Sequence, residues 1–324
     1  MSDTSLARPL RILFFGTPEF ALVSLEALLR SRHQVVGVVT QPDRPRGRGQ
    51  RVSESPVKQR AVSAGLPVLQ PERLRDPGFL EAAAALKADL GVVAAYGKIL
   101  TDRVLALPPL GLLNVHGSVL PRHRGAAPVH RAVIAGDTET GVTIMRVVKA
   151  LDAGPMFATA SRPIAIDETS AEVERDLAIL GADLLVTTLD DLTAERTHET
   201  PQDETTATYA PRLTKEDGNV DWNWPALRLH NLIRGLHPWP HASAFLNDRR
   251  VILHRSAISD AATDAAPGTI LEAHGDRLLV ATGDGALDLV EVQAEGKRKM
   301  RVREFLAGHS VAVGDRFAGP VPPA

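Results

Sequence analysis

Short apolar runs alternate with segments of helical periodicity through the first half of the chain. A buried strand is read from a continuous apolar run, and an amphipathic helix from apolar residues every three to four positions. Such runs predict strands at residues 11–15, 35–39, 90–95, 112–115, 142–145 and 156–159. Helical spacing predicts helices at residues 20–29, 79–88 and 172–192, with Thr17 capping the first and Pro18 opening it. The alternation indicates an α/β fold with a largely parallel, doubly wound, Rossmann-like sheet.

The pattern changes after this third helix. Residues 193–208 are rich in Thr, Glu and Asp, as a linker would be, and one more helix is predicted around residues 224–235. Short apolar runs follow at residues 244–246, 251–253, 268–271, 278–281 and 287–290. Short strands at such spacing predict a small, OB-like β-barrel. We therefore expect one domain over residues 1–195, a linker over 196–213 and a C-terminal β-barrel domain over 214–324.

Composition narrows the class of protein. The 324 residues carry a formal net charge of −2, which argues against a globally basic nucleic-acid-binding protein, so such a role needs a local patch. The absence of cysteine excludes disulfides, thiolate metal sites and a cysteine nucleophile. No apolar run is long enough to span a bilayer, and residues 1–9 lack the apolar core of a signal peptide. We expect a cytoplasmic enzyme that acts as a monomer, away from the membrane.

The chemistry is concentrated at the end of the strand predicted at residues 112–115. Asn114 and His116 are two positions apart, so in an extended segment their side chains point the same way. An amide can donate to a developing oxyanion, and an imidazole can donate to it or move a proton. Loops at the carboxyl ends of strands are where open α/β sheets place their active sites. This strand end is therefore the candidate site.

Other familiar motifs are missing or weak. The first strand ends in Gly16-Thr17-Pro18 and not in G-x-G-x-x-G, so a dinucleotide cofactor is poorly supported. The chain has neither a P-loop nor a G-x-S-x-G nucleophile elbow. His237 and His241 are four residues apart, but Pro238 and Pro240 interrupt the helix that a metal-binding pair would need. We therefore predict no metal site.

Four motifs resemble those of the 10-formyltetrahydrofolate-dependent formyltransferase family. The first is Asn114-x-His116-x-Ser118-x-x-Pro121 followed by Arg124-Gly125-Ala126-Ala127-Pro128, and the second is the D-x-G loop Leu151-Asp152-Ala153-Gly154. The other two resemble family members that formylate a charged initiator tRNA. They are TQPDRPRGRGQ at residues 40–50 with SPVK at 55–58, and YAPRLTKED at residues 209–217 with Asp221-Trp222.

The resemblance implies a reaction and a set of residues. The α-amine of methionyl initiator tRNA would attack the formyl carbon carried on N10 of the co-substrate 10-formyltetrahydrofolate. Asn114 and a protonated His116 would stabilise the oxyanion, and Asp152 would hold the imidazole, favour its charged form and help to move the proton. The transfer requires no metal. The family's folate contacts carry over onto Ser118, Val119, Leu120 and Pro121.

Two basic segments are candidates for contact with the tRNA. Residues 42–60 hold six basic residues against two acidic ones, in a Gly/Pro-rich loop where arginine suits phosphate contact and base stacking. The alternative is an ordinary solvated loop. The resemblance implies that this loop enters the acceptor arm of the tRNA, through Arg44, Arg46, Arg48 and Arg51. A second basic run at residues 297–303 is either an exposed helix start or a further tRNA contact, through Lys297, Arg298 and Lys299.

Three alternative functions remain open on the sequence. A formyltransferase for a small amine, such as a nucleotide-linked amino sugar or glycinamide ribotide, would share Asn114, His116 and Asp152, but it needs neither the arginine loop nor the barrel. A non-catalytic RNA-binding protein would leave these three residues unexplained. A nucleotide-dependent oxidoreductase is disfavoured by the missing glycine fingerprint. Taken one at a time, Asn114, His116 and Asp152 each also fit a structural role, such as shaping a turn. Their occurrence together, in the order found in the family, favours a catalytic role.

Overall fold

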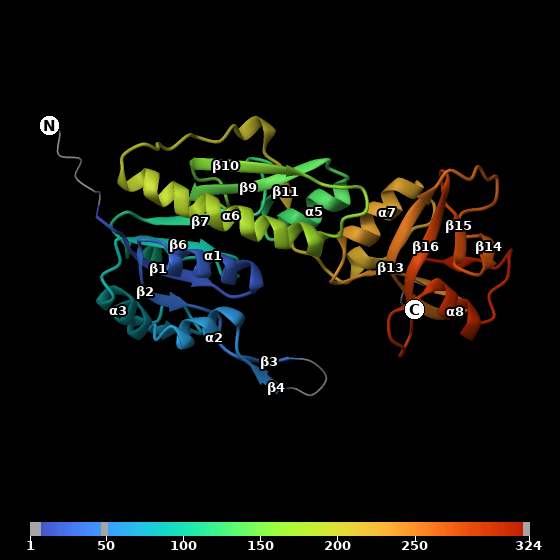
Figure 1. The fold of residues 1–324 in the computed structure, drawn as a ribbon, viewed down its shortest axis with the longest axis horizontal. Coiled ribbons are helices and arrows are strands. Elements are labelled where there is room, and N and C mark those ends of the chain that lie inside the picture. Colours follow the sequence, from blue (N-terminus) through green and yellow to red (C-terminus); the bar gives the residue numbers. More distant parts are fainter. Residues whose placement is uncertain (1–7, 47–50, 320–324) are drawn as a thin grey trace. The chain divides into compact units, whose positions relative to one another are not determined.

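The computed structural model describes residues 8–46 and 51–319, which form two compact units (Figure 1). The first unit holds the described residues up to Pro128 together with Thr140–Arg162 and Glu174–Ala210. The second holds Val129–Glu139, Pro163–Val173 and the described residues from Pro211 onward. Each unit is therefore discontinuous in sequence. Residues 1–7 and Arg48 lie outside the described ranges, as do the side chains of Arg46 and Arg51.

A seven-stranded sheet forms the centre of the first unit, in the order β10-β9-β7-β6-β1-β2-β5. Its strands are β1 (Arg11–Gly16), β2 (Gln34–Val39), β5 (Val68–Leu69), β6 (Leu90–Ala94), β7 (Leu112–His116), β9 (Glu139–Arg146) and β10 (Met156–Pro163). The strands from β7 to β5 are parallel, and β9 is antiparallel to β7. The predicted α/β class with a largely parallel sheet is confirmed.

Helices connect these strands along the chain. Those of the first unit are α1 (Glu19–Arg30), α2 (Pro56–Ser63), α3 (Pro77–Ala85), α4 (Asp102–Leu105) and α6 (Ser170–Thr193) from Glu174 onward. The helix α5 (Pro128–Ala135) belongs, apart from Pro128, to the second unit. The expected cap of the first helix is wrong. Pro18 occupies the N-cap position of α1, and the hydroxyl of Thr17 instead donates to the carbonyl of Tyr96 at 3.3 Å, because the carboxyl ends of β1 and β6 lie side by side.

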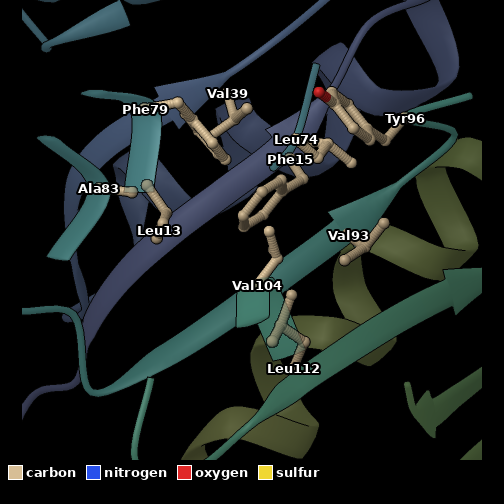
Figure 2. Packing of buried hydrophobic residues seen from close by; sticks show 10 residues of the cluster. All are labelled: Leu13, Phe15, Val39, Leu74, Phe79, Ala83, Val93, Tyr96, Val104 and Leu112. Atoms are coloured by element: carbon tan, nitrogen blue, oxygen red, sulfur yellow. The ribbon is translucent and has the colours of Figure 1, made fainter. Parts of the chain in front are cut away.

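Apolar side chains of β1 alternate between the two faces of the sheet, so both faces are buried. On one face Leu13 and Phe15 pack against Phe79 and Ala83 of α3, in the cluster shown in Figure 2. On the other face the long helix α6 approaches so closely that a Cβ on Gly181 would lie 2.9 Å from Val115 of β7. Burying both faces explains why these strands have continuous apolar runs.

The second unit contains an antiparallel sheet in the order β14-β15-β16-β13-β12-β18, with β17 paired to β16. Its strands are β12 (Ala242–Leu246), β13 (Arg249–Ser259), β14 (Ile270–His274), β15 (Arg277–Ala281), β16 (Ala286–Ala294), β17 (Met300–Arg301) and β18 (Phe317–Ala318). The helices α7 (Ala226–Gly235) and α8 (Val302–Gly308) accompany it. Among residues 8–46 and 51–319, no helix is both long and apolar enough to cross a membrane.

Hydrogen bonds join the two ends of this strand order. The amide of Ile270 donates to the carbonyl of Asp315, and the amide of Phe317 donates to the carbonyl of Gly268, both at 2.8 Å. At this seam Gly268 has φ +88°, and a Cβ there would lie 2.4 Å from the carbonyl oxygen of Phe317, so only glycine fits. The sheet therefore closes on itself, and the predicted small barrel is confirmed.

Candidate active site

Asn114 and His116 lie at the carboxyl end of β7, as the sequence predicts. Asn114 is partly exposed, whereas His116 is buried with 5% of its surface accessible. Because β7, β6, β1 and β2 are parallel, their carboxyl ends meet at the same edge of the sheet. The loop after β7 leaves from this edge. Because β9 runs antiparallel to β7, the loop between β9 and β10 begins beside the amino end of β7, and its Asp152 approaches His116.

The D-x-G loop brings Asp152 to His116. Oδ2 of Asp152 lies 3.7 Å from Nδ1 of His116 and accepts a hydrogen bond from the amide of Gly125 at 2.8 Å. On the other side of the ring, Nε2 of His116 lies 3.0 Å from the carbonyl oxygen of His123. A carbonyl can only accept, so Nε2 carries the proton and a neutral ring presents its lone pair at Nδ1.

The backbone of His123 takes part in this arrangement. The residue has φ +58°, its carbonyl accepts from His116, and its amide donates to the hydroxyl of Thr208 at 2.8 Å. The orientation of the catalytic-site imidazole therefore rests on a main-chain carbonyl, which a different side chain at this position would also supply.

Burial controls the ionisation of His116. Desolvation lowers its pKa below the usual 6.5, and this effect outweighs the charge of Asp152 and the hydrogen bond to His123, which both raise the pKa. Burial therefore favours the neutral form of the ring, although the Asp152 carboxylate lies only 3.7 Å away. The protonated His116 that the resemblance implies stays a prediction.

The D-x-G loop is held by a tight backbone contact and one amide side chain. A Cβ on Gly154 would lie 1.9 Å from the carbonyl oxygen of Arg146, so the loop can approach β9 only with glycine there. The side-chain amide of Gln202 donates to the carbonyls of Asp152 at 2.8 Å and Gly154 at 2.7 Å. These contacts fix the backbone that carries the Asp152 carboxylate.

Arg124 connects Gln202 to the loop after β7. Its guanidinium, in a residue only 2% exposed, donates to Oε1 of Gln202 at 3.0 and 2.8 Å and to the carboxylate of Glu204 at 2.8 Å through two nitrogens. Sequence reasoning missed Gln202 and Glu204, because they lie in a polar stretch that is typical of a linker. The signal that could have pointed to them is that an arginine buried at Arg124 needs hydrogen-bond partners.

The first part of the expected linker therefore lies within the first unit. Residues Tyr209–Ala210 form β11, which pairs in parallel with β8 (Arg124–Gly125), and the carbonyl of Thr208 accepts from the amide of Arg124 at 2.9 Å. Gln202, Glu204 and residues 208–210 thus contact the loop after β7, which also orients His116.

The predicted folate-binding residues have unequal environments. Ser118 is buried and its hydroxyl donates to the carbonyl of Arg122 at 2.6 Å, and Leu120 is also buried. Val119 and Pro121 are partly exposed. Ser118 and Leu120 therefore shape the loop, and Val119 and Pro121 are the members of this group available to a ligand. Their contact with folate stays a prediction.

The first basic segment forms a hairpin of β3 (Arg44–Arg46) and β4 (Arg51–Ser53), which extends beyond α2 in Figure 1. Lys58 pairs with Asp43 and, at 2.9 Å, with Glu54, and Arg60 pairs with Glu26 of α1 at 2.5 Å. The Lys58 pairs hold the base of the hairpin, and the Arg60 pair joins α2 to α1. Arg44 is exposed, with a long 3.9 Å contact to Glu72. The side chains of Arg46 and Arg51 lie outside what the structure describes.

The second basic run is largely compensated by carboxylates. Arg298 pairs with Glu304 at 3.2 Å and Lys299 with Glu291 at 2.8 Å. These residues line a hollow of about 490 Å³, together with Asp276, Met300, Arg301 and Arg303. The run includes β17 and the start of α8, so a helix start is part of its structure. Its mixed charge makes it a weaker candidate for tRNA contact than the hairpin.

Comparison with known proteins gives a consistent picture. Residues 10–189 match a family model described as formyl transferase, and residues 212–310 match one described as formyl transferase, C-terminal domain. A methionyl-tRNA formyltransferase from Desulfotalea psychrophila is 48% identical over 304 residues, which are 94% of this chain and 94% of that protein. One from Solibacter usitatus is 45% identical over 308 residues, covering 95% of this chain and 98% of that protein.

A solved structure shares the fold. The N-formyltransferase from Helicobacter canadensis, crystallised with folinic acid and dTDP-3-aminofucose, superposes with a TM-score of 0.67 at 16% sequence identity. The superposition covers 90% of this chain and 100% of that one.

The ionisation of His116 can be measured directly. In histidine-labelled protein, the NMR resonance that disappears in His116→Gln should titrate below 6.5, because burial lowers its pKa. Asp152→Asn should lower this pKa further, since it removes the charge that favours the imidazolium. Asp264→Asn, an exposed change in the second unit, is the control and should leave it unchanged. A pKa at or above 6.5, or one raised by Asp152→Asn, would contradict this account.

Proposed function

This chain belongs to the formyl transferase family, and we propose that it transfers the formyl group of 10-formyltetrahydrofolate to the α-amine of methionyl initiator tRNA. The observation that carries the proposal is the pairing of His116 with Asp152 beside Asn114, at the carboxyl edge of the sheet. The relatives named methionyl-tRNA formyltransferase, which match nearly the whole chain, support the choice of acceptor.

The proposed mechanism uses the neutral form of His116. The amine attacks the formyl carbon, and the side-chain amide of Asn114 donates to the oxyanion that develops. The lone pair at Nδ1 of His116 accepts the proton that the attacking nitrogen must lose, and Asp152 stabilises the imidazolium that forms. Collapse of the intermediate breaks the bond from carbon to N10, and the proton moves from His116 to N10 of the departing tetrahydrofolate. No metal takes part in these steps.

We propose that the hairpin supplies the main electrostatic contact with the tRNA, through Arg44, Arg46, Arg48 and Arg51. The whole chain has a net charge of −2, so attraction to phosphate must come from a local surface. The exposure of Arg44 supports this role, and Lys58 holds the base of the hairpin through Asp43 and Glu54. Lys297, Arg298 and Lys299 would add a weaker contact.

We propose that the loop of residues 118–121 binds the folate co-substrate through Val119 and Pro121, while Ser118 and Leu120 hold its shape. The loop follows directly on His116, so a donor bound there would have its formyl group within reach of the imidazole. The protein would act as a cytoplasmic monomer in this scheme.

The proposed reaction is tested by transfer of labelled formyl from 10-formyltetrahydrofolate to Met-charged initiator tRNA, with Met-charged elongator tRNA as the parallel acceptor. We expect rapid transfer that is selective for the initiator. If the protein formylates a nucleotide-linked amino sugar or glycinamide ribotide and does not formylate tRNA, its acceptor is a small amine and the proposed tRNA acceptor is wrong. Salt-sensitive RNA binding with no transfer to any acceptor would overturn the proposal of an enzyme.

Removing either partner of the His116–Asp152 pair should lower kcat. We expect His116→Ala and Asp152→Ala to lose about 10²–10⁴-fold, the usual range for a positioned acid–base group. His198→Ala, which changes an exposed histidine of the same unit, is the matched control and should keep its activity. Far-ultraviolet circular dichroism checks that the variants are folded. Turnover near that of the unmodified protein in either variant would remove that residue from the mechanism.

Loss of the hairpin arginines should weaken tRNA binding and leave folate binding intact. In Arg44→Ala/Arg46→Ala/Arg51→Ala we expect KM for tRNA to rise about tenfold or more, with a shallower dependence on salt, because fewer counterions are released. KM for 10-formyltetrahydrofolate should not change. Arg8→Ala is the control, since Arg8 pairs with Asp89 at 2.7 Å near the amino ends of β1 and β6. An equal effect in the control, or no effect in the triple variant, would dismiss the hairpin as a tRNA contact.

A further inference from the structure

Three histidine side chains gather in the second unit. His237 and His241 lie in the segment between α7 and β12, and His254 lies in β13. One ring nitrogen of each lies within 4.8 Å of those of the other two. The rings of His241 and His254 have centroids 4.5 Å apart, and those of His237 and His241 are 5.3 Å apart. The three side chains therefore form one cluster.

The backbone explains how residues four apart meet without a helix. The sequence argument against a helix is sound, because α7 ends at Gly235. The amide of His241 donates to the carbonyl of Leu236 at 3.1 Å, so the chain turns back over this segment. Ala242 of β12 then pairs with Leu253 of β13, which places their neighbours His241 and His254 together. Sequence spacing alone could not show this third histidine.

The cluster has polar atoms that nothing in the protein satisfies. Nδ1 of each of the three histidines is buried, and it has no hydrogen-bond partner among residues 8–46 and 51–319. His254 itself is only 5% exposed. Buried nitrogens without partners are rare, because each one forfeits the hydrogen bonds it makes in water. Three such atoms in one cluster of rings point to a bound group that accepts lone pairs.

The tautomer of His254 is set by its neighbours. The side-chain amide of Gln293 donates to the carbonyl of Lys297 at 2.8 Å, which fixes which end of that amide faces the cluster. Its oxygen therefore accepts from Nε2 of His254, at 3.0 Å. A protonated Nε2 leaves Nδ1 as the unprotonated, coordinating nitrogen. A ring nitrogen oriented by an acceptor on its far side is the usual arrangement of a histidine that binds a metal.

Burial, more than the surrounding charges, favours the neutral form of the rings. Burial lowers the pKa of all three histidines, and that of His241 falls to about 4. The charges that act on the cluster are those of Lys299, Arg250 and Arg255, which repel a cation, and those of Glu172 and Glu291, which attract it. Arg255 pairs with Glu172 and Lys299 with Glu291, both at 2.8 Å, so much of the repulsion is compensated.

We propose that His237, His241 and His254 bind a divalent transition-metal cation, Zn²⁺ or one of similar preference, with water as a further ligand. Neutral imidazole suits these cations, and three protein ligands with an open position are a known zinc geometry. Zinc–nitrogen bonds of about 2.0–2.1 Å would draw the nitrogens to roughly 3.4 Å from one another, a modest closure of the cluster. The ion would link the segment after α7 to β13, outside the residues proposed for formyl transfer.

Zinc binding by the full-length protein tests this proposal. After treatment with a chelator, dialysis against Zn²⁺ and metal analysis should give one equivalent, and Co²⁺ should give the visible spectrum of a tetrahedral site. We expect at least tenfold weaker binding in His237→Asn and in His241→Asn, which change partly exposed residues, and in His254→Gln. Gln293→Ala should cost about 10–100-fold, because the orientation of His254 is lost. His274→Asn, an exposed histidine of β14 outside the cluster, is the control and should bind as the unmodified protein does.

A second readout follows from the positions of tryptophan. The three tryptophans of the chain, Trp222, Trp224 and Trp239, all lie in the second unit, so their fluorescence reports its unfolding. Zn²⁺ should raise the Tm of this transition in the unmodified protein and not in the variants of the cluster. The proposal is overturned if the double variant His237→Asn/His241→Asn binds Zn²⁺ as tightly as the unmodified protein does. It is also overturned if His274→Asn loses as much Zn²⁺ affinity as the variants of the cluster. If His254→Gln does not fold, the single changes at the partly exposed His237 and His241 decide the question.

Discussion

The buried guanidinium of Arg124 is the constraint on which the candidate active site depends. An arginine with so little exposed surface must have its donors satisfied, and the partners come from Gln202 and Glu204, far along the chain. To reach it, the chain stays on the first unit after α6, up to Ala210. The same course of the chain places Gln202 against the carbonyls of Asp152 and Gly154. One desolvated cation thus joins the two loops that carry the site.

The balance between burial and charge at His116 sets what this site can do. A more exposed imidazole beside a carboxylate would be largely protonated near pH 7, and it could then only donate. Here burial lowers its pKa, and the carbonyl of His123 holds the proton on Nε2. The lone pair is therefore available on the side of Asp152 before any substrate arrives. The attraction between the Asp152 carboxylate and the ring is strongest when the ring gains a positive charge during proton transfer. An interaction that strengthens on the way to the transition state is one that accelerates a reaction.

Sequence patterns predicted most of what depends on local order. Continuous apolar runs located the strands, and the spacing of Asn114 and His116 placed them correctly at a strand end. What escaped prediction depends on partners distant in sequence. The charge of the basic runs is reduced by ion pairs such as Arg60 with Glu26 and Lys299 with Glu291. The same holds for three other features, which arise only when the chain packs. They are the contacts that residues 202–210 make in the first unit, the lowered pKa of His116, and the contact of His241 with His254.

The closure of the barrel determines when the second unit can be completed during synthesis. Part of this unit, residues 129–139 and 163–173, leaves the ribosome early. The closing hydrogen bonds of the barrel, however, need the backbone of residues 315–317 to pair with that of Gly268 and Ile270. Until those residues leave the ribosome, β14 presents an unpaired edge. The first unit, by contrast, has all of its strands once residue 210 has emerged. While residues 315–317 are still inside the ribosome, the nascent chain therefore has every strand of the first unit, but the sheet of the second unit still has an open edge.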